Sequence, residues 1–113
     1  MPSVHQFRAP VDALNYEILQ EQASALGRLG RGLEAALKDL REFDAAHPQP
    51  DVLPEERRKR RALISAAGHA LWMFVVQRES CGLRESRSVM RDYNVPAEVQ
   101  DQMGVFPAAV GAG

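Results

Sequence analysis

The most regular pattern in this chain is a set of apolar positions that repeats every seven residues through its first half. The repeat consists of Leu19, Leu26, Leu33 and Leu40, with a second set three residues later at Leu29, Ala36 and Phe43. Spacings of three and four place such side chains in one stripe along a helix. The pattern predicts a long helix that starts with Asp12 as its cap, ends near Phe43 or Ala45, and packs against other helices.

Three glycines, at Gly27, Gly30 and Gly32, fall inside this helix. Each costs roughly 1 kcal/mol relative to alanine in a helix interior. The leucine repeat keeps its phase across them, so we expect a continuous helix, with a kink near residue 30 as the alternative. Ala23, Gly27 and Gly30 share one side, which predicts that a neighbouring backbone approaches there.

A connection over residues 46–54 separates the first helix from a second one. The run from His47 to Pro50 cannot continue a helix, because proline lacks the amide donor and restricts the residue before it. Pro54 suits the first turn of a helix that ends near Ser80 or Cys81, just before Gly82. Its expected core positions are Ile64, Ala67, Leu71, Phe74, Val75 and Arg78. Between residues 66 and 76 this helix is apolar nearly all round, so we expect protein on most of its sides.

Shorter elements follow Gly82. We expect a helix over 84–93 with Val89, Met90 and Tyr93 inward, and another over 97–103 that ends at Gly104. No alternating strand pattern occurs. The sequence therefore predicts an all-α fold, a long antiparallel helical hairpin plus a short C-terminal helix pair. Its predicted organisation is a flexible N-terminal arm over 1–10, a single helical domain over 11–106 and a disordered tail over 107–113.

One such hairpin is a thin layer, and two copies would form a four-helix bundle with a shared core. We therefore predict a homo-oligomer, most simply a twofold dimer. The alternative is a monomer whose C-terminal helices fold back over the second helix. The residues expected in the core or the oligomer interface are Leu19, Leu26, Leu29, Leu33, Leu40, Ile64, Leu71, Phe74 and Val75.

Charge and composition narrow the class of protein. The 113 residues carry a net charge of −1, yet residues 12–44 sum to −3 and residues 55–79 to +3, which suits two segments that lie side by side. A single cysteine, Cys81, excludes a disulfide-stapled secreted fold. The N-terminus has no signal or lipidation pattern, so we expect a cytoplasmic location. The longest apolar stretch, 62–76, spans about 22 Å, too short for the bilayer, so no membrane partner is expected.

Candidate chemistry is sparse. His69 and Cys81 lie about 120° apart around the second helix and cannot form a dyad or a zinc pair within one chain. We expect His69 to be buried or interfacial. Glu17 and Glu21 lack the Glu-x-x-His motif of di-metal bundles, and no phosphate loop, nucleophile elbow or metalloprotease motif occurs. We therefore expect neither catalysis nor a cofactor or metal, and keep a metal enzyme centred on His69 as a third hypothesis.

The basic cluster, Arg57, Arg58, Lys59, Arg60 and Arg61, is the strongest local feature after the leucine repeat. These side chains are candidate phosphate contacts on nucleic acid, or else partners of the acidic first helix. The two short C-terminal helices could form a helix-turn-helix. The would-be recognition helix carries Glu98 and Asp101 and no basic residue, so nucleic acid is not the favoured partner.

Two stretches, from Leu14 to Leu19 and from Met90 to Val99, resemble a family of small uncharacterised bacterial helical proteins. The resemblance implies a bacterial cytosolic helical protein without an assigned activity, and it assigns a role to no residue. Our leading hypothesis is a non-catalytic, homo-oligomeric protein that interacts with or assembles an unknown protein partner. The alternative is a nucleic-acid-associated protein that uses the cluster at 57–61.

Overall fold

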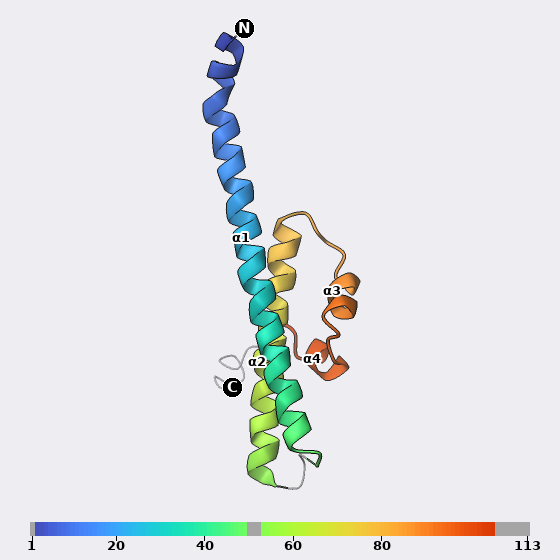
Figure 1. Cartoon of the computed structure of the whole chain (residues 1–113). Coiled ribbons are helices and arrows are strands. Elements are labelled where there is room, and N and C mark those ends of the chain that lie inside the picture. The colour runs from blue at the N-terminus through green and yellow to red at the C-terminus, as the bar shows by residue number, and fades with distance from the viewer. Residues whose placement is uncertain (1, 50–52, 106–113) are drawn as a thin grey trace.

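Two long antiparallel helices form the body of the molecule, and two short helices lie along one side of it (Figure 1). The computed structural model describes residues 2–49 and 53–105. The helices are α1 (Pro2–Ala46), α2 (Pro54–Ser80), α3 (Arg87–Asp92) and α4 (Ala97–Asp101). These residues form helices and no strand, which confirms the predicted all-α hairpin with a short C-terminal helix pair. The tail predicted over 107–113 lies outside the described residues.

Helix α1 is continuous over 45 residues, about 67 Å of helix axis. The prediction of an unbroken helix through Gly27, Gly30 and Gly32 is confirmed. The predicted start at Asp12 is wrong, because the helical backbone already begins at Pro2. That prediction took Pro10 as a boundary. A proline removes one amide donor, and here the helix continues on both sides of it.

The ends of the other helices follow local backbone chemistry. Helix α2 ends as predicted before Gly82, whose φ of 88° is readily reached only without a side chain, and Leu83 N donates to Arg78 O at 2.8 Å. Helices α3 and α4 are shorter than expected. Asn94, at φ 51°, ends the turn after α3, and Val95 N donates to Met90 O at 2.9 Å. Pro96 then leads into α4.

The core lies between the carboxyl-terminal half of α1, α2 and the α3–α4 segment. Its buried members are Leu33, Leu37, Leu40, Ile64, Ala67, Leu71, Phe74, Val75, Val89, Val95 and Val99. Leu26 and Leu29 are partly buried against it. The Tyr93 ring meets the Phe74 ring edge-on with centroids 5.4 Å apart. Arg78, expected in the core, is half-buried with its guanidinium 5.9 Å from the Phe74 centroid.

Close approach occurs at two glycines, and only one of them was expected. A Cβ added at Gly30 would lie 2.9 Å from the Tyr93 hydroxyl, so the side chains of α2 and the α3–α4 segment fill this gap. A Cβ at Gly27 would meet only Arg31 of its own helix, so the predicted backbone approach to α1 is wrong. The backbone approaches α2 instead, at Gly68, where an added Cβ would lie 2.9 Å from the carbonyl oxygen of Gln102.

Two alanine substitutions in long helices should therefore change stability in opposite directions. Gly32→Ala gains helix propensity where an added Cβ meets nothing within 4 Å, and should stabilise the fold by about 0.5–1 kcal/mol. Gly68→Ala gains the same propensity but pushes the backbone after α4 away from α2, and should destabilise the fold by about 1–3 kcal/mol. Urea unfolding of both variants at one protein concentration measures this; equal shifts would contradict the packing at Gly68.

Candidate interaction surface

The amino-terminal half of α1 projects beyond the end of α2, and no other described helix lies beside it (Figure 1). We call residues 11–25 the α1 extension. Every residue from 11 to 20 is exposed, including large apolar ones: Val11 at 60 %, Leu14 at 56 %, Tyr16 at 62 %, Ile18 at 48 % and Leu19 at 63 %. Leu19 is therefore not in the core of the protomer, and its place in an oligomer interface stays a prediction. Among the described residues, the extension is thus a helix with exposed apolar side chains that no other helix covers.

One face of the α1 extension carries most of this apolar surface. Val11, Leu14, Ile18 and Ala25 recur at spacings of three, four and seven residues, which keeps them on one side of a helix. In the part of α1 that packs on α2, the positions in phase with Ile18 and Ala25 are Gly32 and Asp39, and both are exposed. The leucines that pack in the core, Leu33 and Leu40, are in phase with Leu19 instead. The stripe therefore lies beside the core-facing side of α1, which Leu19 continues.

A second exposed apolar surface runs along α2. Its exposed residues, which we call the α2 outer face, are Ala62, Ala66, His69, Met73 and Val76. Their spacings alternate between four and three residues, the pattern of a helix-packing seam. They lie opposite the buried positions Ile64 and Leu71. The prediction that protein covers most sides of α2 therefore does not hold within the described chain.

His69 lies in the middle of the α2 outer face. It was expected to be buried or interfacial; the structure exposes it, with its ring 6.4 Å from the Trp72 ring and nearly parallel to it. The prediction of a buried histidine is wrong, and an interfacial role stays a prediction. The apolar flanks of His69 that suggested burial belong to the outer face itself.

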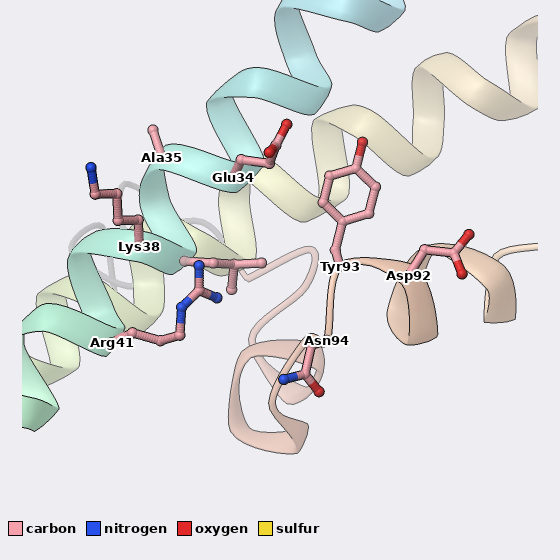
Figure 2. Close-up of a pocket in the computed structure, with 8 residues that line it drawn as sticks. Glu34, Ala35, Lys38, Arg41, Asp92, Tyr93 and Asn94 are labelled. Atoms are coloured by element: carbon pink, nitrogen blue, oxygen red, sulfur yellow. The ribbon is translucent and has the colours of Figure 1, made fainter.

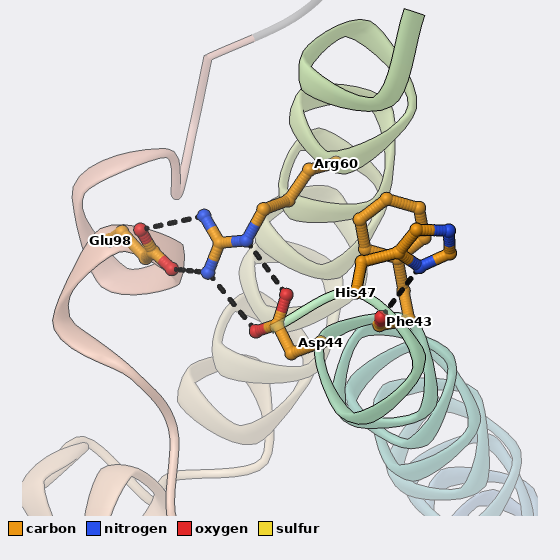
Figure 3. Close-up of polar contacts among 5 residues, drawn as sticks. All are labelled: Phe43, Asp44, His47, Arg60 and Glu98. Carbon is orange, nitrogen blue, oxygen red and sulfur yellow. Dashed lines mark hydrogen bonds and ion pairs between the residues drawn. The ribbon is translucent and has the colours of Figure 1, made fainter. Parts of the chain in front are cut away.

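Arg60 fixes the end of the hairpin that lies farthest from the α1 extension. Its Nε donates to Asp44 Oδ1 at 2.8 Å and its Nη2 to Asp44 Oδ2 at 3.1 Å (Figure 3). Nη1 donates to Glu98 Oε2 at 3.2 Å, and Nη2 also reaches Glu98 Oε1. The hydrogen bonds to Asp44, and then those to Glu98, raise the pKa of Arg60 above its usual value. One guanidinium thus joins α1, α2 and α4.

This arrangement divides the basic cluster. Arg60 forms ion pairs with two carboxylates. The pair with Asp44 is the contact between the basic cluster and the acidic first helix that the sequence suggested as the alternative to phosphate binding. Glu98 belongs to α4, which was the candidate recognition helix. Arg58, Lys59 and Arg61 are exposed. Arg58 and Lys59, with Glu55 and Ala62, line a shallow hollow at the start of the α2 outer face. The cluster is therefore part structural and part surface.

The carboxyl-terminal end of α1 is closed by His47. Its Nδ1 donates to Phe43 O at 2.9 Å and its ring stacks on the Phe43 ring with centroids 4.1 Å apart (Figure 3). Its Nε2 lies 3.8 Å from Glu56 Oε1 at the start of α2. The contacts of His47 serve the turn between the long helices.

An open hollow lies between α1 and the α3–α4 joint (Figure 2). Glu34, Lys38 and Arg41 line it from α1, and Asp92 and Asn94 from the opposite wall. Its charges are mixed, and Figure 2 shows Asp92 and Asn94 on a different segment from the α1 cations. The residues that line it place no nucleophile beside a base.

The remaining chemical candidates lie apart. Cys81 is half-buried at the end of α2, and its Sγ lies 3.7 Å from Gln77 Nε2. Glu17 and Glu21 are exposed on the α1 extension. Among residues 2–49 and 53–105, no three histidine, cysteine or acidic side chains gather as metal ligands. In the same part of the chain, no helix combines the length and hydropathy needed to cross a bilayer.

Sequence reasoning indicated that the second helix is apolar on most sides, but it did not define the α2 outer face or the stripe on the α1 extension, although two signals were present. The predicted second helix is shorter than the first, which leaves part of the first without a partner. The alternating spacing from Ala62 to Val76 is visible in the sequence. This spacing was not recognised as a separate face, because the apolar residues of the opposite, core-facing side make the helix apolar nearly all round.

Comparison with known proteins extends the resemblance seen in the two short stretches. The model of a family described as a family of unknown function (DUF6665) matches residues 4–111. No curated protein and no solved structure matches the chain. The match confirms the resemblance to an uncharacterised family and adds no functional residue.

Removal of the Arg60 guanidinium should loosen the joint between three helices. We expect Arg60→Ala to destabilise the fold by about 1–2 kcal/mol, because both carboxylates are partly exposed and regain water. Arg60→Lys should recover only part of this loss, since an ammonium cannot match the fork geometry. Arg58→Ala, the control, should stay within about 0.5 kcal/mol in the same urea unfolding measurement. Equal losses at positions 58 and 60 would contradict the assignment.

Proposed function

We propose, for a chain that belongs to the family of unknown function DUF6665, that its work is non-catalytic and consists of homo-oligomeric helical assembly in the cytoplasm. The observation that carries the proposal is the apolar stripe on the α1 extension, where Val11, Leu14 and Ile18 share one side of the helix and are 60 %, 56 % and 48 % exposed. Contiguous apolar surface of this kind on a folded protein marks an interaction site.

Helix energetics support the same proposal. An isolated amphipathic helix is stabilised mainly by packing of its apolar face, and without a partner its ends fray. Within the described part of the chain, residues 11–21 of the α1 extension are all exposed and lack such packing. A partner that covers it removes apolar area from water at about 25 cal/mol per Å² and also stabilises the helix.

The layout of polar groups favours binding over chemistry. Among the described residues, the ion pairs of Arg60 with Asp44 and Glu98 join helices of the same chain, and the His47 ring lies near Glu56 at the turn between α1 and α2. The hollow lined by Glu34 and Asn94 is open and of mixed charge. Apolar helix faces are thus the surfaces through which we propose that the protein works.

Nucleic-acid association is the second candidate, favoured by one observation: Arg58, Lys59 and Arg61 are exposed close together at the start of α2. Such a cluster suits phosphate contacts. Arg60 is excluded from this role by its two carboxylates, so a test of the candidate must leave Arg60 in place.

Mass in solution tests the assembly proposal. At micromolar concentration, light scattering should give twice the chain mass of 12.5 kDa. The value should persist from low to high salt, because an apolar interface is not weakened by screening. A mass of one chain under these conditions would refute homo-oligomeric assembly.

Binding of duplex DNA and single-stranded RNA tests the second candidate. We expect no binding at moderate salt and no difference between the wild type and an Arg58→Ala/Lys59→Ala/Arg61→Ala variant. Binding that falls steeply as salt rises and is lost in this variant would establish phosphate contacts and make nucleic-acid association the leading function.

A further inference from the structure

We propose that the α1 extension of one chain packs on the α2 outer face of a second copy, and that the reciprocal contact closes a twofold dimer. The inference rests on the assembly proposed above and names the two surfaces that form it. The apolar residues that form most of each surface are exposed in the single chain: Val11, Leu14 and Ile18 on the α1 extension, and Ala62, Ala66, Met73 and Val76 on the α2 outer face.

The two surfaces match in length and spacing. The stripe from Val11 to Ala25 and the face from Ala62 to Val76 each cover 15 residues, about 21 Å between their end residues. The α2 outer face uses spacings of four and three throughout, and the stripe uses three and four up to Ile18 and then one step of seven to Ala25. The alanines of the α2 outer face leave hollows, and the branched side chains of the stripe are suited to fill them as knobs.

The shape of the protomer fixes the direction of this packing. The α1 extension lies beyond the end of α2, so the α2 helix of a second copy reaches its level only when that copy points the opposite way (Figure 1). Since α1 and α2 are antiparallel within a chain, the extension then runs parallel to the partner's α2. Copies that point the same way would bring extension against extension.

Charged residues at the edges support the parallel direction. In it, Asp12 lies at the end where the partner surface carries Arg58, and Arg28 lies at the end that carries Glu79. All four side chains are exposed in the single chain. The reverse direction would place Arg28 beside Arg58 and Asp12 beside Glu79, two like-charge contacts. Exposed pairs add little affinity, but they discriminate between orientations.

The twofold axis makes the contact occur twice. Each α1 extension becomes a third long helix beside the hairpin of the other copy, and the two contacts are identical by symmetry. A second copy is therefore the occupant that covers both surfaces with one interaction. It also explains why a single chain exposes two apolar faces of equal length.

Two charge substitutions on opposite sides of the contact test the inference. Ile18→Glu changes the α1 extension and Met73→Lys changes the α2 outer face; both residues are exposed in the single chain, so its fold should persist. Each variant alone should dissociate to the mass of one chain, with a Kd at least about a hundredfold higher. Gln20→Glu, an exposed change on the opposite side of the extension, should leave the dimer intact.

A mixture of the two variants gives the decisive result. In a heterodimer of I18E with M73K, one of the two contacts has wild-type residues on both sides. The other contact brings the carboxylate introduced by I18E against the ammonium introduced by M73K, which are opposite charges. We therefore expect the mixture to recover a mass of two chains by light scattering. Recovery does not follow from extension-to-extension pairing, in which M73K alone would stay dimeric.

The outcomes separate the inference from the function it rests on. A wild-type mass of one chain contradicts both. A dimer that resists M73K, or a mixture that stays monomeric, overturns the inference and leaves homo-oligomeric assembly standing. Far-UV circular dichroism checks that each variant is helical. If a charged variant loses its helices, Leu14→Ala/Ile18→Ala replaces it, and its Kd should rise at least about tenfold; an unchanged Kd overturns the inference.

Discussion

The length of α1 relative to its partner is the constraint on which the rest of this structure depends. Helix α1 has 45 residues and α2 has 27, so the hairpin covers the carboxyl-terminal part of α1 and leaves residues 11–21 exposed. Apolar residues on α1 do not stop where α2 stops, because Leu19 continues the core-facing leucine repeat and Val11, Leu14 and Ile18 form an exposed stripe beside it. In such a protomer, contacts between helices hold one end of the hairpin together, and the other end carries the exposed α1 extension.

The end of the hairpin near Arg60 is held together by contacts that need particular residues. Arg60 binds Asp44 and Glu98 and so joins α1, α2 and α4, while Gly68 lets the segment after α4 lie directly on α2. These contacts place α4 against one side of α2. On the opposite side of α2, Met73 and Val76 are exposed, and no other described helix lies over them. The packing that completes the protomer therefore determines which of its surfaces remain for a partner.

Much of the fold could be predicted from the sequence. The leucine repeat, Pro54 and Gly82 indicated both long helices, because periodicity and backbone restriction act locally. The approach of Gln102 to Gly68 and the bridge from Arg60 to Glu98 were not predicted, since both join residues more than 30 positions apart. The start of α1 was misplaced because Pro10 was weighed as a boundary without the long helix around it.

The central claim is that the α1 extension contacts the α2 outer face of another copy, and cross-linking measures this contact directly. With Cys81→Ser to remove the native thiol, I18C in one chain and H69C in a chain of different length are mixed and treated with a short bismaleimide. We predict a cross-linked product that contains one chain of each length. Products that join only I18C to I18C, in a protein that is dimeric, would contradict the account.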